Sequence, residues 1–461
     1  MKKLRVQNRF SPLIPTMILT FIFLNASHAQ VDKSPMDLRD IIREALVNNA
    51  GITAAKINVE VVETGRTVAA RQRLPRLELF ASYEVFPVED KLLLPRHMDI
   101  PTAEQVLPMP QGMLDFFQEQ FNTNIFNSGI KVKLPLYTGG RIGAGIELQE
   151  AMMDQAELDL KSKTNDLVFV IVRAYYKTLQ LQKVVEANQK AVESLTEAKR
   201  IVERQLEVGK ATNVDVFRIN ARLADIEQNL IKARFSIERT HGLLNSLMGR
   251  KVTDELHIIG VLQYGPTQFS LQESIDQALQ SNPEYLSIQA LGVSQLQKVR
   301  IAKSARLPNL SLMGFYKGAY GDISPDFRDD AAVVVNISVP LFTGGIVRSK
   351  IEREELILKK IEAKQRALGQ RISQEVYSAY LGINEAEKQI EVTEIAILET
   401  EESLRIEKQR LEQGKGVVKD VLDAQVDHLK TEVKYYRALS DYNVAVMALK
   451  KTIGTIYTSK E

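Results

Sequence analysis

The stretch Leu-Pro-Leu-Tyr-Thr-Gly-Gly at residues 134–140 returns as Val-Pro-Leu-Phe-Thr-Gly-Gly at residues 339–345. The same offset of 205 residues relates Asp215 to Asp420 and Gly249 to Gly454. A long tandem repeat that keeps its register indicates one duplicated supersecondary unit. We therefore expect two tandem structural repeats, at 30–249 and 250–461, that form one body.

A second offset relates the segments before this stretch, since Arg-Leu-Pro at 73–75 returns 233 residues later at 306–308. The difference between 233 and 205 means that the first copy carries 28 extra residues, which include the proline-rich segment 87–110. Surface loops tolerate long insertions, so this point of each copy is expected to be a loop tip.

Composition excludes several classes of function. The net charge of +2 argues against a nucleic-acid partner, and the absence of cysteine excludes disulfides, thiolate catalysis and Cys-ligated zinc. The five histidines are scattered, so we expect no metal site and no cofactor. No nucleophile–base grouping or phosphate loop is visible, and an enzyme is not expected.

The N-terminus has the pattern of a secretory signal peptide. Lys2, Lys3 and Arg5 give a basic start, a mostly apolar run follows, and Ser27-His28-Ala29 gives a small-x-small cleavage pattern. We predict a signal peptide at 1–29 and a mature chain from about Gln30. An uncleaved N-terminal anchor is the alternative.

Each copy is predicted to begin with an amphipathic helix that runs to its Arg-Leu-Pro, where proline stops it. Period-two alternation then predicts strands at about 76–86 and 128–137, and again at about 309–320 and 331–342. Strands of about 10 residues with one apolar face suit a transmembrane β-barrel. They also suit the edge of a soluble sandwich, which stays open as an alternative.

Long helical hairpins are predicted at 140–249 and 345–454. A 4-3 spacing of mostly apolar residues runs from Leu167 to Leu206 and from Ile372 to Leu411, which indicates coiled-coil packing. Roughly 67 residues of helix span about 100 Å. The returning helices are only about half as long, and the opening helix of the next copy is expected to stack on their ends, with residues 250–270 as the joint.

This arrangement resembles the TolC-like outer membrane efflux protein family, also called outer membrane factors. The motifs that carry the resemblance are the doubled Thr-Gly-Gly stretch, the paired glycine turns and Val-Val-Lys-Asp-Val-Leu-Asp-Ala at 417–424. The resemblance implies an α+β membrane protein that assembles as a homotrimer. Long coiled-coil hairpins would form a trimeric α-barrel, capped by a twelve-stranded transmembrane β-barrel with four strands per chain. Independently, four strands cannot close a barrel in one chain, and open sheet edges are not viable in lipid.

The family's function implies a passive outer-membrane exit duct of a Gram-negative bacterium that extends into the periplasm. Its partners would be a periplasmic adaptor and an inner-membrane transporter of the RND, ABC or MFS type, in a tripartite efflux or type I secretion system. The alternative is a periplasmic coiled-coil adaptor or scaffold. Two hairpins with membrane-type strands in one chain favour the duct.

The resemblance also implies a periplasmic gate at Asp420 and Asp423, with Asp215 at an inter-helix contact position. Asp420 and Asp423 are three residues apart and share one helical face, although an acid at a helix start also complements the helix dipole. Candidate tip and adaptor-docking residues are Gly209, Lys210, Gly414 and Lys415. Relatives can carry an arginine that helps hold the closed state at the position of Gly416, so a closing network through this residue is not expected here, and Lys415 or Lys419 is the alternative.

Overall fold

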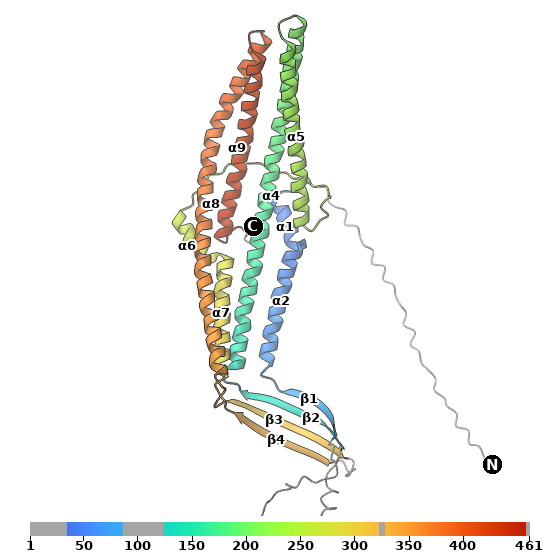
Figure 1. The fold of residues 1–461 in the computed structure, drawn as a ribbon, viewed down its shortest axis with the longest axis vertical. Helices are drawn as coiled ribbons and strands as arrows, with labels where there is room; N and C mark the ends of the chain where they lie inside the picture. Colours follow the sequence, from blue (N-terminus) through green and yellow to red (C-terminus); the bar gives the residue numbers. More distant parts are fainter. Residues whose placement is uncertain (1–34, 86–123, 322–327, 458–461) are drawn as a thin grey trace, which may run out of the picture.

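The computed structural model describes residues 35–85, 124–321 and 328–457, which form one elongated body of helices with a sheet at one end (Figure 1). The signal peptide expected at 1–29 and most of the loop predicted at 87–127 lie outside these residues. The first copy contains α1 (Leu38–Asn48), α2 (Ala50–Arg71), β1 (Arg76–Val85), β2 (Asn124–Tyr137), α4 (Arg141–Glu207) and α5 (Asn213–Leu247). The second contains α6 (Leu271–Ser281), α7 (Pro283–Ser304), β3 (Asn309–Gly321), β4 (Arg328–Ser338), α8 (Ile346–Glu412) and α9 (Val418–Thr452).

The four strands form one antiparallel sheet in the order β1-β2-β3-β4, so β1 and β4 are its edges. Alternate residues of the edge strands present large apolar side chains to the surroundings: Leu79 is 82% exposed and Val333 is 76% exposed. A face this apolar is out of place in water. It is the face that a transmembrane strand turns toward lipid.

Two strand predictions need correction at their ends. β2 begins at Asn124 rather than near residue 128, because Asn124 pairs with Val85 at the far end of β1. β4 ends at Ser338 rather than near residue 342, because its neighbour β3 begins only at Asn309. Pro340 also lacks the N–H group that a strand residue would donate.

Each Thr-Gly-Gly follows a strand and precedes a helix of 67 residues, α4 or α8, which is about 100 Å long at 1.5 Å per residue. Gly140 and Gly345 precede these helices with φ of 81°, a left-handed conformation that favours glycine. The predicted heptad stripe is buried on α8 at Ile372, Val376, Ile383 and Ile390. In the described ranges, no helix combines the length and hydropathy needed to cross a bilayer.

α4 also buries a second stripe of residues, which the 4-3 spacing did not predict. It contains Val168, Val172, Tyr175 and Leu179. These residues pack with Leu38, Ile42 and Leu46 of α1 and with the segment after α5. α4 is therefore covered on more than one side, which a single 4-3 stripe does not indicate.

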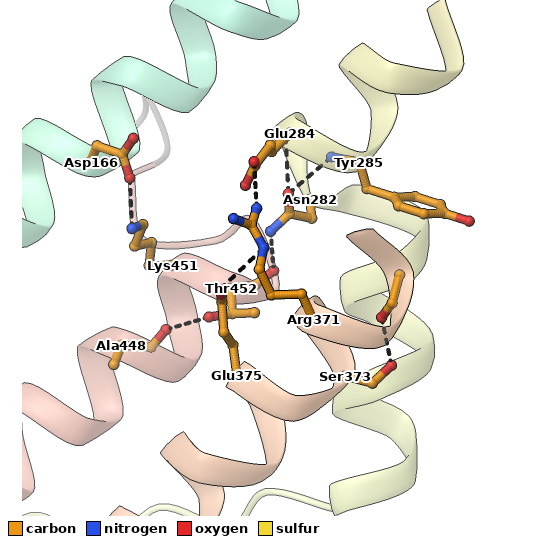
Figure 2. A network of polar contacts seen from close by, with 11 residues as sticks. Asp166, Asn282, Glu284, Tyr285, Arg371, Ser373, Glu375, Ala448, Lys451 and Thr452 are labelled. Atoms are coloured by element: carbon orange, nitrogen blue, oxygen red, sulfur yellow. Dashed lines mark hydrogen bonds and ion pairs between the residues drawn. The ribbon is translucent and has the colours of Figure 1, made fainter. Parts of the chain in front are cut away.

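The opening helix of each copy is broken at an asparagine, contrary to the prediction of one continuous helix. Asn282 accepts hydrogen bonds from the N–H groups of Glu284 and Tyr285, at 2.9 and 3.2 Å, and so caps α7. Its Nδ2 donates to the carbonyl of Thr452 at 2.9 Å, at the end of α9 (Figure 2). Asn49 likewise caps α2 and donates to Leu247 O at 2.9 Å. Each opening helix thus stacks on the returning helix of its own copy, and not of the preceding copy as predicted.

Charged pairs on neighbouring helices surround the second of these joints. Arg371 on α8 pairs with Glu284 on α7 and lies 3.6 Å from Glu375. Lys451 on α9 pairs with Asp166 on α4 at 2.6 Å. Figure 2 shows these contacts around the end of α9, where helices from both copies meet.

Residues 250–270 form a strap that connects the two copies across one face of the helices. Met36 pairs with Ile258 of the strap in a parallel bridge. Tyr175 on α4 donates its hydroxyl to Ile259 O at 2.7 Å, and Tyr442 on α9 donates to Gly265 O at 2.7 Å. The faces of α4 and α9 that carry Tyr175 and Tyr442 are therefore the faces covered by the strap.

Candidate functional site

Both hairpin tips turn on a glycine in the left-handed conformation, Gly209 with φ of 73° and Gly414 with φ of 70°. Glycine adopts this conformation without the steric penalty that other residues pay, so both turns need it. The next residue closes each turn: Lys210 N donates to Gln205 O at 2.7 Å, and Lys415 N donates to Arg410 O at 2.9 Å. Both lysine side chains are exposed at the end of the molecule.

The first tip (residues 205–218) and the second tip (residues 410–423) are joined by polar contacts that sequence reasoning missed. Gln205 Nε2 donates to Leu411 O at 2.8 Å, and further back Ser194 Oγ donates to Gln425 Oε1 at 2.5 Å. Gln425 is buried within an otherwise apolar stripe of α9. The sequence did carry a signal for this contact, because a polar residue such as Gln425 at a core position of a heptad needs a hydrogen-bond partner.

Asp215 is engaged at the start of α5. Its Oδ2 accepts from the backbone N of Thr212 at 3.1 Å and from the Thr212 hydroxyl at 2.7 Å, and so completes a capping box. Its Oδ1 lies 3.5 Å from Arg218 Nη1, and the side chain is only 18% exposed. Within one protomer these partners all lie near the start of α5, and the inter-helix contact predicted for Asp215 is not among its described interactions.

Asp420 and Asp423 are both exposed at the start of α9. Asp420 lies in the first turn, where the helix dipole favours a negative charge. Its carboxylate has no side-chain partner among the residues that the structure describes. Asp423 lies 3.3 Å from Lys419, one turn earlier, in a pair that is more than half exposed. The two carboxylates thus remain available to ions in solution.

At Gly416, the position for which the resemblance implied an arginine in relatives, the backbone of the second tip leaves little space for a side chain. A Cβ atom at Gly416 would lie 2.7 Å from Leu411 N and 2.9 Å from the carbonyl carbon of Arg410. Both are backbone atoms, and Gly416 N donates to Arg410 O at 2.9 Å. Any side chain at Gly416 would therefore require the backbone of the second tip to shift.

The described ranges contain no group of three or more His, Asp or Glu side chains placed as metal ligands. The candidate site is instead a pair of turns. Lys210 and Lys415 are exposed in the turns, and Asp420 and Asp423 are exposed at the start of α9. Such an arrangement binds or excludes ions by charge.

Comparison with known proteins identifies the family. The profile described as outer membrane efflux protein matches residues 41–250 and again residues 274–455. The outer membrane protein TolC of Vibrio cholerae is 24% identical over 72% of this chain and 78% of its own length. The outer membrane efflux protein BepC of Brucella suis is 22% identical over 71% of each chain.

A solved structure agrees with this assignment at the level of the fold. The outer membrane protein VceC from Vibrio cholerae superposes with a TM-score of 0.73 over 90% of this chain and 96% of its own, at 19% identity. With its duplicated hairpins, its sheet with an exposed apolar face and its match to the family profile over most of the chain, this protein belongs to the outer membrane efflux protein family.

Proposed function

We propose that three copies of this chain form a passive exit duct through the periplasm and outer membrane of a Gram-negative bacterium. Cargo would arrive from an inner-membrane transporter of the RND, ABC or MFS type through a periplasmic adaptor. The observation that carries the proposal is that one protomer leaves both its helical wall and its sheet with uncovered edges.

The helical edges are apolar. Within a protomer α4 packs against both α5 and α9, and α9 packs against α8, so α5 and α8 lie outermost. Large exposed apolar side chains follow both: Phe217, Ile231 and Phe235 on α5, and Val392, Ile395 and Leu398 on α8. Contact between α5 of one copy and α8 of the next is heterologous, and such contacts close into a ring when the rotation permits.

The sheet supports the same assembly. β1 and β4 are its edges, and unpaired strand edges are not tolerated in lipid. Three copies that join β4 to β1 would give twelve strands and no edge. A homotrimer, detected by native mass spectrometry in a neutral detergent, is the expected species. A single monodisperse monomer would contradict the assembly.

The proposed duct requires that the chain is exported and that its helical tips face the periplasm. Residues 1–29 would act as a signal peptide, the repeats at 30–249 and 250–461 would form the mature protein, and the loop at 87–127 would lie outside the cell. The tips at Gly209, Lys210, Gly414 and Lys415 would then face the periplasm, where exposed lysines next to the apolar Val208, which is 68% exposed, could receive an adaptor.

We further propose that Asp420 and Asp423 set ion selectivity at the periplasmic mouth, while Asp215 holds the neighbouring helix start. Three protomers would bring six exposed carboxylates toward one axis, which attracts cations and repels anions. The test is single-channel recording in planar bilayers. The double variant Asp420→Asn/Asp423→Asn should lose cation preference and block by multivalent cations.

The matched control is Asp215→Asn, which removes an acid at the equivalent position of the other tip. It should keep the cation preference because Asp215 is engaged with Thr212 and Arg218. Unchanged selectivity and block in a correctly assembled double variant would show that these acids do not line the pore.

A further inference from the structure

A cleft of about 710 Å³ lies between α4, α5 and α9, at the height of the strap. Its charged lining residues are Arg173 and Lys177 on α4, and Arg437 and Asp441 on α9. Apolar side chains complete the wall, among them Leu243 of α5 and Val444 of α9. We call it the basic cleft, since three cations and one acid line it.

The basic cleft lies on the side of the helices opposite the strap. Residues two apart on an α-helix point about 200° apart. Arg173 and Lys177 flank Tyr175, which binds the strap, and therefore both point away from it. Val444 stands in the same relation to Tyr442, the strap residue of α9. Strap and cleft thus occupy opposite faces of one helical wall.

The same face of α9 leads from the basic cleft to Asp423 at the second tip. Asp423 and Arg437 are 14 residues apart, which is two heptads, so they occupy the same position of the heptad repeat. Fourteen residues of helix separate them by about 21 Å along the axis. A solute that passes Asp423 on this face therefore meets Lys430, one heptad further along, and then the cations of the cleft.

Two of the cations lack an anionic partner. Arg437 lies 3.4 Å from Asp441, whereas Lys177 donates to the neutral Gln180 Oε1 at 2.8 Å. Across the described parts of the chain, no carboxylate forms an ion pair with Arg173 or Lys177. Burial lowers the pKa of Lys177, and Asp441 acts in the opposite direction. A bound anion would supply the counter-charge that the protein itself leaves out.

We propose that the basic cleft binds amphiphilic organic anions, with the carboxylate or sulfonate between Arg173, Lys177 and Arg437 and the apolar body against Leu243 and Val444. The placement of this face inside the duct rests on the proposed function. Three copies would then form a basic collar beyond an acidic mouth. Anionic cargo would be held there after it has been driven past the acidic mouth, which repels it, and before it moves toward the outer membrane.

The probe is 1-naphthalenesulfonate, which combines an aromatic body with one fixed negative charge. Isothermal titration calorimetry on the purified protein in neutral detergent should detect binding. The variant Arg173→Gln/Lys177→Gln should weaken it about tenfold, which corresponds to the loss of two partly exposed ion pairs. The control Arg39→Gln/Lys161→Gln removes two exposed cations outside the cleft and should bind as the wild type does.

Two further ligands test the chemical class. Inorganic sulfate that binds as tightly as 1-naphthalenesulfonate would overturn the amphiphile assignment. The cation 1-naphthylmethylamine, if it bound equally well, would overturn the anion assignment. Equal affinity for 1-naphthalenesulfonate in the wild type and the cleft variant would overturn the site itself.

Single-channel recording separates the site from the duct. Block of the current by 1-naphthalenesulfonate, relieved in Arg173→Gln/Lys177→Gln, supports a cleft inside the pore. Calorimetric binding that leaves the current through open channels unchanged would keep the site but overturn its placement inside the duct.

Discussion

The two hairpin tips share a glycine turn and differ in their side chains. Both turn on a left-handed glycine, and in both the next N–H group donates to a carbonyl five residues earlier. The side chains at matched positions differ: Thr212 corresponds to Val417, and Arg218 corresponds to Asp423.

The acid that both tips share has a different environment in each. Asp215 is engaged by Thr212 and Arg218, whereas the N-cap residue before Asp420 is Val417, whose side chain cannot cap the helix, and the residue three positions after Asp420 is a second acid. Duplication thus supplied one turn twice, and the first copy uses its acid to hold the helix while the second leaves it exposed. An acid at the same position of both repeats therefore has a different role in each.

The largest difference in stability between the tips is expected at Gly416, whose counterpart in the first tip is Ala211. Gly416→Arg places a Cβ within 3 Å of backbone atoms, so the second tip must open. Overpacking of this kind costs about 1–3 kcal/mol. Faster amide exchange at residues 411–416, measured by hydrogen–deuterium exchange, is the expected result.

Ala211→Arg is the control, because a Cβ atom is already accommodated there. Exchange at residues 206–211 should stay as in the wild type. Protection that is retained in Gly416→Arg would mean that the turn relaxes without opening.

Exchanging the N-cap residues of α5 and α9 tests whether the caps account for the difference between the tips. Thr212→Ala removes the capping box of α5 and should cost about 1 kcal/mol. Val417→Thr should instead stabilise α9 by a similar amount, because its hydroxyl can cap the helix and recruit Asp420 as Asp215 is recruited. Chemical denaturation would measure both changes, and opposite signs are expected. A destabilised Val417→Thr would show that Val417 contributes more through packing than a cap can replace.

A third difference lies where each returning helix ends, since His241 of α5 corresponds to Val446 of α9. His241 Nε2 is buried, has no hydrogen-bond partner among the described residues, and burial lowers the pKa of the imidazole from 6.5. The unfolded chain therefore takes up the proton first as the pH falls. The contribution of neutral His241 is fully present above about pH 6.5 and is lost as the pH falls toward the folded-state pKa.

His241→Val introduces the residue that the second repeat has at this position, Val446, and should remove the loss of stability at low pH. The difference in free energy of unfolding between variant and wild type should grow from pH 7.5 to pH 5.5, within about 1 kcal/mol. Denaturant midpoints at several pH values would measure it. A difference that does not change with pH would mean that His241 is hydrated in the folded protein.

Much of this architecture follows from sequence patterns that have one physical solution. The doubled Thr-Gly-Gly, the heptads from Leu167 to Leu206 and from Ile372 to Leu411, and the glycine at each tip together predict two long hairpins, because a sustained heptad requires a packed helix and a left-handed glycine ends it. The strands were predicted because a two-residue period marks a half-exposed strand.

What escaped prediction depends on side-chain hydrogen bonds between distant segments. The break at Asn282 had a local signal, because Pro283 at the first helical position marks a helix start. The hydrogen bond from Asn282 to Thr452 had no signal in the sequence, and this bond places α7 at the end of α9. Gln205 and the crowding at Gly416 likewise depend on residues that only the folded tips bring together.

The smallest effect on stability and the clearest effect on charge are expected from Asp423→Arg, which converts the second tip to the charge pattern of the first. Arginine at this position would lie three residues from Asp420, as Arg218 does from Asp215. Such a pair stabilises a helix by only about 0.2–0.5 kcal/mol.

The charge at the proposed mouth would nevertheless change by two units in each protomer, or six in a trimer. Bilayer recordings should therefore show that cation preference is lost or reversed, with the denaturation midpoint almost unchanged. Lys419→Gln is the companion variant, because it frees Asp423 from its 3.3 Å pair and should strengthen cation binding. Equal selectivity in both variants would mean that Asp423 faces away from the ions, and the functional contrast between the tips would then rest on Asp420 alone.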